Sequence, residues 1–358
     1  MMKKYEEIVS WVRDRIDQGE LCYGDRLPSE KELTETFAVS RQTVRRALEV
    51  LSEEGIVEGR RGSGTYVAVK KRQRSSQIRI AVMLTYVDTY IFPSIIKGIE
   101  RVLSEEGAAL QICVTDNAVE KERMILQDFL RTRAVDGLIA EPVKSGLPSP
   151  NLELYKEIEK AGIPVLFINS FYSGLDIPHI SLDDQEAGYL AAKHLLECGH
   201  TRIGGIFKSD DGQGHRRYAG YTKALMEREI KIKGSRVIWM DSEEIRQMGL
   251  ESPRVLERLK DCTACVCYND EIAYKLVRML GKAGIRVPDE MSVTGIDNSS
   301  LAELGAVPLT SVKNPAEDLG RGAAVKMLDR LLKERPLGTE ELEPELVIRN
   351  SVCVISQI

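Results

Sequence analysis

Apolar residues recur with helical spacing near the start of the chain. In residues 3–18 they fall on one face, and Gly19 follows the last of them. The members of this face are Tyr5, Ile8, Val9, Val12 and Ile16. The pattern predicts one amphipathic helix at the N-terminal end.

Two further helices are predicted by capping signals followed by apolar spacing. Ser29 stands three residues before Glu32, the spacing at which both side chains satisfy exposed amides at a helix start. After a brief turn, Ser40 precedes another amphipathic stretch over residues 40–55. Its inward face consists of Val44, Leu48 and Leu51. The second and third helices are therefore joined by a tight turn.

The third predicted helix is polar and basic in its first turns. The side chains there are Arg41, Gln42, Thr43, Arg45 and Arg46. Such a helix pair suits reading of the DNA major groove, where Arg can bind guanine and Gln can bind adenine. Beyond Gly55, two apolar runs flank a loop at residues 59–64 that is rich in glycine and arginine, which is typical of a wing contacting the minor groove or phosphates. This loop lacks the Lys-Ser/Thr ending of a nucleotide-binding loop.

Charge is distributed unevenly along the chain. The 358 residues carry a formal net charge of -5. Residues 40–74 nevertheless contain 9 Lys and Arg against 4 Asp and Glu. Positive charge is thus concentrated where a polyanion would be met. Residues 70–77 are basic and polar without periodicity, and they are predicted to form a linker.

Residues 1–69 resemble the GntR family of winged-helix repressors through the segment LPSEKELTETFAVSRQTVRRALEVLSEEGIVEGRRGSGTYV. The resemblance covers the turn, the third helix and the wing together. It implies DNA contacts at Ser29, Lys31, Ser40, Arg41, Gln42, Thr43, Arg45, Arg61, Gly62, Ser63 and Gly64, with Lys4 as a further phosphate contact. Each residue alone has surface solvation as its alternative, whereas together they form a binding face.

From Ile78 onward, apolar runs alternate with amphipathic helical stretches. The runs are IRIAVML, ALQICV, DGLIA, PVLFIN, RIGGIF, RVIWM, ACVCY and MSVTGI. This alternation predicts parallel strands with crossover helices, hence an α/β domain over residues 78–358. A break near residues 179–184 suggests two successive lobes.

Polar and aromatic residues follow the predicted strands where each strand ends. They are Tyr86, Asp88, Tyr90, Glu141, Asn169, Phe171, Asp210, Asn269, Asp270 and Asp297. In parallel sheets, ligands gather beyond the carboxyl ends of the strands. Carboxylates, amides and aromatic faces together suit a sugar. Helix capping is the alternative for such residues; it is preferred for Asp183, whereas ligand contact is preferred for Asp270 and Asp297.

The seven cysteines do not form a disulfide framework. Cys262, Cys265 and Cys267 resemble a metal cluster, but Cys265 and Cys267 alternate within one apolar run and no fourth ligand lies near. Buried packing is therefore predicted, with no metal or cofactor. No leader pattern and no apolar run long enough to span a bilayer is recognisable, so we expect a cytoplasmic protein without a membrane partner.

The body resembles the lac repressor family, whose sensor domains share the two-lobed fold of periplasmic sugar-binding proteins. The segments that carry the resemblance are DGLI, DDQEAGYLAAKHLLECGHTRIGGI, RRYAGY, YNDEIAYKLVRMLGKAGIRVPDEMSVTGIDN and LTSVKNP. The resemblance implies effector contacts at Arg217 and Asp270. It also implies side-by-side association into a homodimer.

A GntR-type head joined to a lac-repressor-type body is similar to the arabinose repressors of Gram-positive bacteria, as are TYVDTYIFPSIIKGIE and INSFYSGLDIPHISLDDQEAG. This resemblance adds Phe92 to the cleft. It implies a repressor that binds double-stranded operator DNA and is released by L-arabinose. Two alternatives stay open: an activator, or a repressor that responds to another small sugar.

Two other classes of protein are disfavoured. Some GntR-type heads are fused to aminotransferase-like enzymes, but those need a longer body and a lysine that anchors pyridoxal phosphate. An exported sugar-binding protein would fit the body alone, yet the head and the lack of a recognisable leader oppose it. We therefore expect a protein that is not an enzyme.

Overall fold

A computed structural model describes residues 4–18, 20–21, 24–60, 63–68, 77–247 and 253–355. The chain divides into two compact units, Met1–Gln77 and Ile78–Ile358. Of the predicted linker, residues 70–76 lie outside the described ranges.

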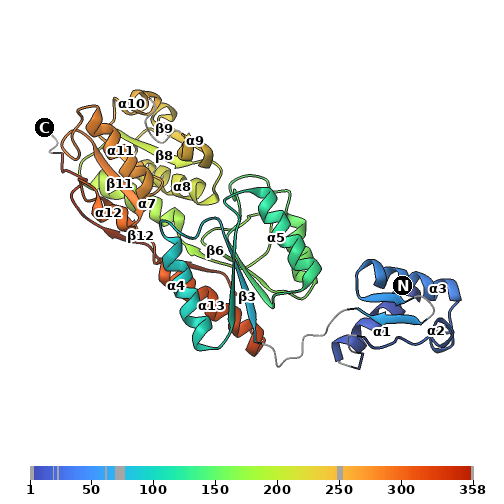
Figure 1. Ribbon diagram of the computed structural model, residues 1–358. Coiled ribbons are helices and arrows are strands. Elements are labelled where there is room, and N and C mark those ends of the chain that lie inside the picture. The colour runs from blue at the N-terminus through green and yellow to red at the C-terminus, as the bar shows by residue number, and fades with distance from the viewer. Residues whose placement is uncertain are drawn as a thin grey trace. The chain divides into compact units, whose positions relative to one another are not determined.

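The first unit is a winged helix-turn-helix, as predicted (Figure 1). Its elements are α1 (Lys4–Gln18), α2 (Glu30–Phe37), α3 (Arg41–Glu53), β1 (Val57–Arg60) and β2 (Gly64–Val67). The two strands pair in antiparallel fashion. One buried cluster joins all five elements, and it contains Ile8, Val12, Leu33, Val44, Leu51, Val57 and Val67. The two predicted amphipathic faces therefore meet in one core.

Capping fixes the turn between α2 and α3. Ser29 and Glu32 form the predicted capping box at the start of α2. The helix ends at Phe37, and the next residue, Ala38, has a φ of 49° in the left-handed region, which reverses the chain. The Ser40 hydroxyl then accepts a hydrogen bond from the Thr43 amide and caps α3.

The second unit contains two six-stranded sheets. The first has the order β13-β7-β6-β5-β3-β4, and the second has the order β14-β12-β11-β10-β8-β9. The strands are β3 (Arg79–Leu84), β4 (Ala109–Val114), β5 (Gly137–Ala140), β6 (Val165–Ile168), β7 (His179–Leu182), β8 (Ile203–Lys208), β9 (Val237–Met240), β10 (Ala264–Cys267), β11 (Ser292–Asp297), β12 (Thr310–Lys313), β13 (Glu340–Leu342) and β14 (Glu345–Val347). All eight predicted apolar runs form strands. The pairs are parallel except for β12 with β14.

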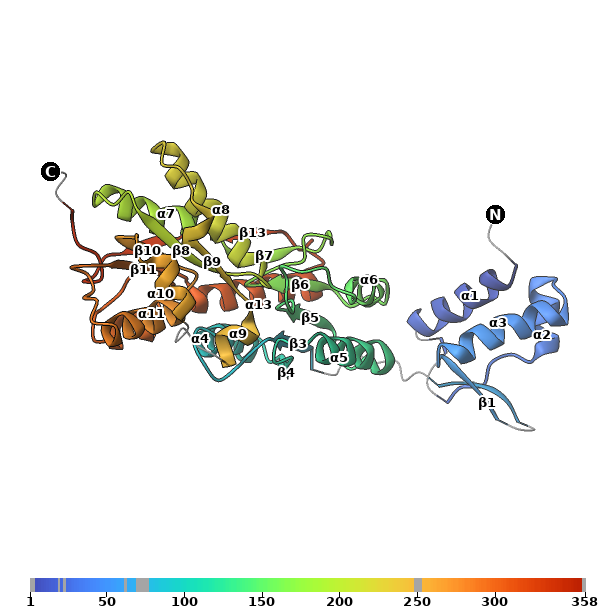
Figure 2. The ribbon, with the colours of Figure 1, turned by 90° about the horizontal axis from the view of Figure 1, so that it is seen from above.

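Helices cover both faces of each sheet (Figures 1 and 2). They are α4 (Phe92–Glu105), α5 (Val119–Thr132), α6 (Leu152–Lys160), α7 (Asp184–Glu197), α8 (Gly212–Glu227), α9 (Ser242–Gln247), α10 (Pro253–Leu259), α11 (Asp270–Lys282), α12 (Ser300–Leu304) and α13 (Ala316–Lys333), with a short 3-10 turn at Gly234–Arg236. Figure 2 shows α7 and α8 on one side of the second sheet and α10 and α11 on the other.

Successive side chains of a strand point to opposite faces of its sheet, so each sheet has an apolar core on both faces. In β3, Ile80 and Val82 face α4 and α13, whereas Ala81 and Met83 face the α5 and α6 side. In β10, Cys265 and Cys267 pack together into one apolar cluster. The predicted burial of these two cysteines on one strand face is confirmed.

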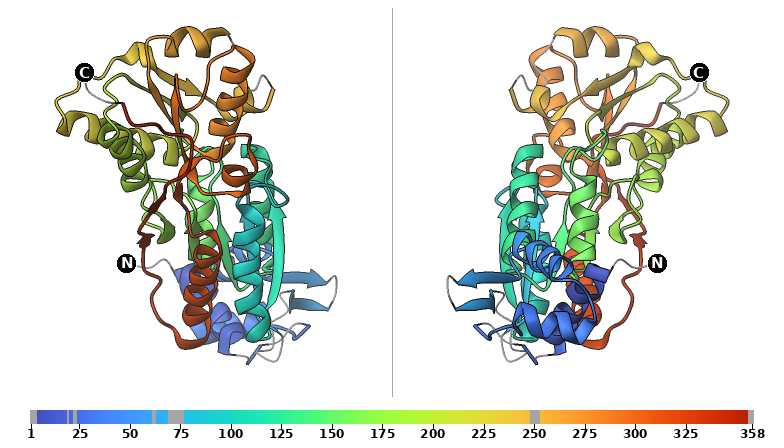
Figure 3. Two further views of the ribbon diagram at one scale, coloured as in Figure 1. Left: turned by 90° about the vertical axis from the view of Figure 1, so that its left-hand side faces the viewer. Right: turned by 90° about the vertical axis from the view of Figure 1, so that its right-hand side faces the viewer.

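The two predicted lobes are present, the first lobe built on the first sheet and the second lobe on the second, but they are not successive in the chain. After β12 the chain crosses back to the first lobe, where α13 packs on the first sheet and β13 joins it (Figure 3). The next strand, β14, belongs to the second sheet. The apolar residues of α13, among them Leu319 and Met327, fill the same core as α4. Gly98 and Gly320 permit this pairing, because a Cβ atom at either position would lie 2.1 Å from a backbone oxygen of the opposite helix.

Candidate functional site

A cavity of about 500 Å³ lies between the two lobes, at the carboxyl ends of their strands. The structure brings nine of the predicted ligand residues together in its lining. They are Tyr86, Asp88, Tyr90, Phe92, Glu141, Asn169, Asp210, Asn269 and Asp297. The strand-end pattern therefore located one common cleft.

Three predicted residues lie outside this lining: Phe171, Arg217 and Asp270. Phe171 stacks on His179, with ring centroids 3.9 Å apart. Arg217 and Asp270 lie one contact further from the cavity, where each supports residues that do line it. Their sequence-based role as ligand contacts stays a prediction.

Glu141 is the best-partnered carboxylate of the first-lobe wall. Its Oε2 atom accepts a hydrogen bond from the Thr85 amide at 2.9 Å and another from the Thr85 hydroxyl. Its Oε1 atom accepts from Asn169 Nδ2 at 2.6 Å. Burial raises the pKa of Glu141, while these donors oppose the rise. Glu141 thus orients the Asn169 amide, and both side chains line the cavity.

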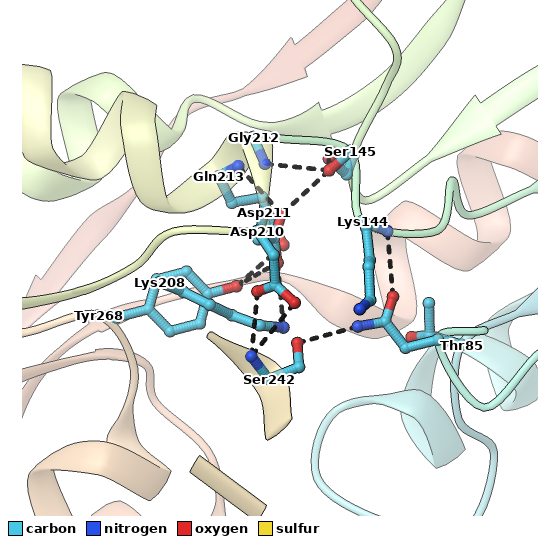
Figure 4. Close-up of polar contacts among 12 residues, drawn as sticks. Thr85, Lys144, Ser145, Lys208, Asp210, Asp211, Gly212, Gln213, Ser242 and Tyr268 are labelled. Atoms are coloured by element: carbon cyan, nitrogen blue, oxygen red, sulfur yellow. Dashed lines mark hydrogen bonds and ion pairs between the residues drawn. The ribbon is translucent and has the colours of Figure 1, made fainter. Parts of the chain in front are cut away.

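Asp211 organises the opposite wall (Figure 4). Its Oδ2 atom accepts from the Tyr268 hydroxyl at 2.6 Å and lies 3.5 Å from Lys208 Nζ. Its Oδ1 atom accepts from the Ser145 hydroxyl at 3.1 Å, a contact that crosses the cleft. Burial acts to raise the pKa of Asp211, but the Lys208 charge and the hydrogen bonds outweigh it and leave the pKa lowered. Asp211 is therefore held as a carboxylate.

A second bridge across the cleft joins Asn117 to Ser242. Asn117 Nδ2 donates to the Ser242 hydroxyl at 2.9 Å, and the Lys144 amide donates to Asn117 Oδ1 at 3.0 Å. The Ser242 amide in turn donates to both carboxylate oxygens of Asp210 at 3.2 Å. The loop after β4 and the start of α9 are thus connected through polar side chains that line the cavity (Figure 4).

Arg217 lies at the centre of a buried ion cluster behind the cavity. Its guanidinium donates to Asp184 Oδ1 at 2.8 Å, to Asp297 Oδ1 at 3.1 Å and to the Tyr268 carbonyl oxygen at 2.6 Å. Burial raises the pKa of Asp184 to about 6, although the Arg217 charge lowers it. The cluster fixes Asp297 at the cavity edge.

Asp270 begins α11 behind the same edge. Its carboxylate accepts from the Ser299 amide at 2.6 Å and from the Ser311 hydroxyl at 2.5 Å. Burial raises the pKa of Asp270 to about 7, in spite of the Ser311 hydrogen bond. Asn269 caps α11 through the Ile272 amide at 3.0 Å. Asp183 caps α7 as the sequence predicted.

The sequence-based list missed a group of polar lining residues. They are Lys144, Ser145, Lys208, Asp211, Gln213 and Ser242. Lys208 ends β8, Asp211 and Gln213 lie within five residues of that end, and Ser242 begins α9 two residues after β9. The same strand-end rule would have found these four if it had been applied to the whole turn and the start of the next helix. Lys144 and Ser145 lie in the longer loop after β5, where no periodicity marks which side chain faces the cleft.

These walls can hold a small ligand that both donates and accepts hydrogen bonds. Carboxylates, amides, hydroxyls and lysines alternate around the cavity, and Tyr86 and Phe92 contribute aromatic surface. Within the described ranges no group of three or more His, Cys, Asp or Glu residues is placed to hold a metal ion. In those same ranges no helix combines the length and apolar content needed to cross a bilayer.

In the first unit, the polar start of α3 is exposed. Arg41, Gln42 and Arg45 are exposed, and Arg45 Nε lies 3.1 Å from Glu30 Oε1. Ser40 and Thr43 bond to each other through their hydroxyls at 2.9 Å. Ser29 is the α2 cap, while Lys31 and Lys4 are exposed. These residues belong to the helix-turn-helix face that the sequence singled out.

The wing is described except at its tip. Arg61 and Gly62, two predicted DNA contacts, lie outside the described residues. Ser63 and Gly64 are exposed, and the Ser63 hydroxyl lies 2.5 Å from the Tyr66 hydroxyl. Gly64 has a φ of 120°, and a Cβ atom there would lie 2.8 Å from Arg26 Nε. Arg26, which the sequence-based list did not include, therefore lies against the base of the wing.

Both units match described families. Residues 4–67 match the model for bacterial regulatory proteins of the gntR family, and residues 192–352 match the model for a periplasmic binding protein-like domain. The chain is 38% identical to an arabinose metabolism transcriptional repressor of Halalkalibacterium halodurans, over 99% of this chain and 97% of that protein. It is 35% identical to a repressor of the same name from Geobacillus stearothermophilus, over 97% and 95% of the two chains.

Solved structures of sugar-bound regulators are also similar. A complex of the transcriptional regulator CelR with cellobiose has a TM-score of 0.67 at 25% identity, and the match covers 87% of this chain and 91% of that one. A LacI family transcriptional regulator from Enterococcus faecium with bound ribose has a TM-score of 0.65 at 25% identity, covering 78% and 100%.

Proposed function

This chain belongs to the family of arabinose metabolism transcriptional repressors, and we propose that it represses sugar-utilisation genes by binding operator DNA and releasing it when L-arabinose enters the interlobe cleft. The observation that carries this proposal is the presence, on one chain, of an exposed polar recognition helix and an interlobe cavity lined by many polar side chains. The identity to the two relatives extends over nearly the whole chain and so covers both features.

DNA binding is assigned to residues 1–69, with a linker at 70–77. The exposed side chains at the start of α3, above all Arg41, Gln42 and Arg45, are proposed to read base edges in the major groove. Arg45 would exchange its Glu30 partner for DNA. Lys4, Lys31 and the wing residues would contact phosphates or the minor groove.

Sugar binding is assigned to the cleft of residues 78–358. The lining offers both acceptors and donors, among them Asp210, Asn269 and Lys208, which suits hydroxyl groups because each hydroxyl donates and accepts. Most lining carboxylates already have donors within the protein, which favours an uncharged ligand. The name of the relatives supplies arabinose, of which we propose the L form. The chemistry of the walls supports a small neutral polyhydroxyl compound.

The proposal also covers the oligomeric state, the cellular location and the absence of enzymatic activity. We propose a homodimer, because two heads that read two half-sites bind more tightly than one. We also propose that the protein acts in the cytoplasm, where the operator is found, and that it is not an enzyme. The relatives are named as transcriptional repressors, which supports a regulatory rather than an enzymatic role.

The test is selection of DNA by the full chain followed by sugar-driven release. Random duplexes are enriched on the protein, and the enriched site is labelled for fluorescence anisotropy. L-arabinose, xylose, ribose, galactose and glucose are then added at matched concentrations. We expect a defined site to be enriched and L-arabinose to release it.

Two outcomes would contradict the proposal in different ways. Failure to enrich any site would contradict the DNA-binding function. Release by another sugar but not by L-arabinose would contradict the effector assignment while leaving the regulatory function in place.

A further inference from the structure

Asp297 ends β11 at the point where the two lobes meet. It lines the cavity and is 5% exposed. Its φ of 98° and the φ of 61° at Tyr90 both lie in the region that residues with a side chain rarely adopt. Backbone strain of this kind persists only where surrounding contacts hold it.

The two carboxylate oxygens of Asp297 are bound to different parts of the protein. Oδ2 accepts from the Tyr90 hydroxyl at 2.7 Å. Oδ1 accepts from Asn314 Nδ2 and from Arg217 Nη2, each at 3.1 Å. The Tyr90 oxygen also accepts a hydrogen bond from the Asp270 amide at 3.2 Å. Tyr90 therefore joins its own lobe to two strand ends of the other.

Tyr90 and Asn314 each stand just before a helix of the first lobe. Tyr90 precedes α4 and Asn314 precedes α13. These two helices pack backbone to backbone at Gly98 and Gly320. Each helix therefore begins two residues after a side chain that donates a hydrogen bond to Asp297. Because the two helices pack so closely, they can shift only as a unit.

We propose that the Tyr90 hydroxyl is a latch on Asp297, and that a ligand hydroxyl which takes its place on Oδ2 frees the paired helices α4 and α13 to shift against the second lobe. This inference rests on the proposed function and supplies its regulatory step. Tyr90 is a positioning residue in this scheme, because it acts through Asp297 and the helix pair.

The latch accounts for how a ligand comes to bind the two lobe arrangements unequally. A ligand changes an equilibrium only by its difference in affinity for the two states. With the latch closed, Asp297 Oδ2 already has a donor at 2.7 Å, whereas in the released arrangement that oxygen is available to the ligand. Oδ1 keeps its Arg217 donor, which belongs to the same lobe as Asp297, in both arrangements, so the carboxylate stays in place.

The first experiment needs no sugar. Hydrogen–deuterium exchange is measured for the full chain with Tyr90→Phe, which removes the acceptor of the Asp270 amide. Tyr86→Phe is the matched control, because Tyr86 also lines the cavity from the same loop. We expect exchange at residues 268–272 and at the start of α4 to rise at least about twofold in Tyr90→Phe only, the lower end of what one hydrogen bond contributes. Equal exchange in the two variants would overturn the latch.

The second experiment measures coupling. Operator affinity is determined with and without L-arabinose for wild type and Tyr90→Phe, and thermal melting confirms folding. We expect Tyr90→Phe to bind L-arabinose at least as tightly as wild type, while the effect of the sugar on operator affinity falls by roughly fivefold or more. Asn314→Ser, which loosens the other side of Asp297, should also reduce this effect.

The outcomes separate the latch from the proposed function. Wild-type coupling in Tyr90→Phe, or loss of sugar binding in that variant, would overturn the latch. If wild type ignores L-arabinose while Tyr90→Phe still raises exchange, the effector assignment fails and the latch stands.

Discussion

Replacing Arg217 by alanine should destabilise the second unit strongly. The Arg217 side chain is 1% exposed, and its partners Asp184 and Asp297 are 3% and 4% exposed. The substitution leaves both carboxylates buried without their shared cation, and it also removes a donor to the Tyr268 carbonyl oxygen. Breaking a buried pair in this way costs about 3–5 kcal/mol of unfolding free energy.

The loss should depend on pH in a definite direction. Burial already raises the pKa of Asp184 from 3.8 to about 6, and Arg217 opposes that rise. A carboxyl group whose pKa is higher in the folded than in the unfolded state takes up protons on folding. The stability that Asp184 contributes is therefore fully present below its unfolded pKa of 3.8, and it is lost as the pH rises through its folded pKa of about 6. Without Arg217 the folded pKa moves higher still, and the variant loses more stability at about pH 8 than at about pH 5.

Urea unfolding followed by tryptophan fluorescence measures this loss. The chain has two tryptophans, so a Trp11→Phe background leaves Trp239 in β9 as the reporter. Arg216→Ala is the matched control, because the neighbouring Arg216 is 32% exposed and pairs with Glu341 at 2.8 Å. A partly exposed pair of this kind contributes about 0–1 kcal/mol. Equal losses in the two variants, or a loss from Arg217→Ala that does not vary with pH, would refute the reasoning.

Other substitutions test the remaining parts of the account. Arg41→Ala should weaken operator binding by roughly 1–3 kcal/mol in anisotropy titrations and leave the sugar affinity measured by calorimetry unchanged. Operator affinity of the wild type should fall steeply with added salt. Equal losses of operator and sugar affinity in Arg41→Ala would contradict the assignment of the two functions to separate units. Asp270→Ala should bind operator yet resist release by sugar, because the Ser299 and Ser311 donors lose their acceptor; release at the wild-type sugar concentration would count against it. Gly320→Ala should lower the melting temperature, because its Cβ would lie 2.1 Å from the Ile95 carbonyl oxygen, whereas Gly281→Ala in α11 meets no atom within 4 Å and should stabilise by roughly 0.4–1 kcal/mol. The reverse order of these two melting temperatures would contradict the helix pairing.

Local patterns in the sequence were sufficient for the first unit and for most strands. Ser29, Ser40 and Asp183 act through residues two or three positions away, so their capping roles could be predicted from spacing alone. The strand ends were equally informative, because parallel strands place their carboxyl ends at one edge of a sheet. That rule brought Glu141 and Asp297 to the same cavity although they lie far apart in the sequence.

What the sequence could not supply depends on contacts between distant segments. The return of α13 to the first sheet rests on backbone contact at Gly98 and Gly320, which no periodicity encodes. Arg217 is behind the lining because two buried carboxylates hold its guanidinium. Their partnership joins α7, α8 and β11, and it could not be inferred from any one of these segments.

The most direct test of the central claim is calorimetric titration of L-arabinose into the full chain, alone and saturated with its selected operator. By linkage, operator must weaken sugar binding by the same factor by which sugar weakens operator binding. The account predicts that L-arabinose binds the free protein and that its affinity falls by that factor when operator is bound. An arabinose affinity that is the same with and without operator would contradict it.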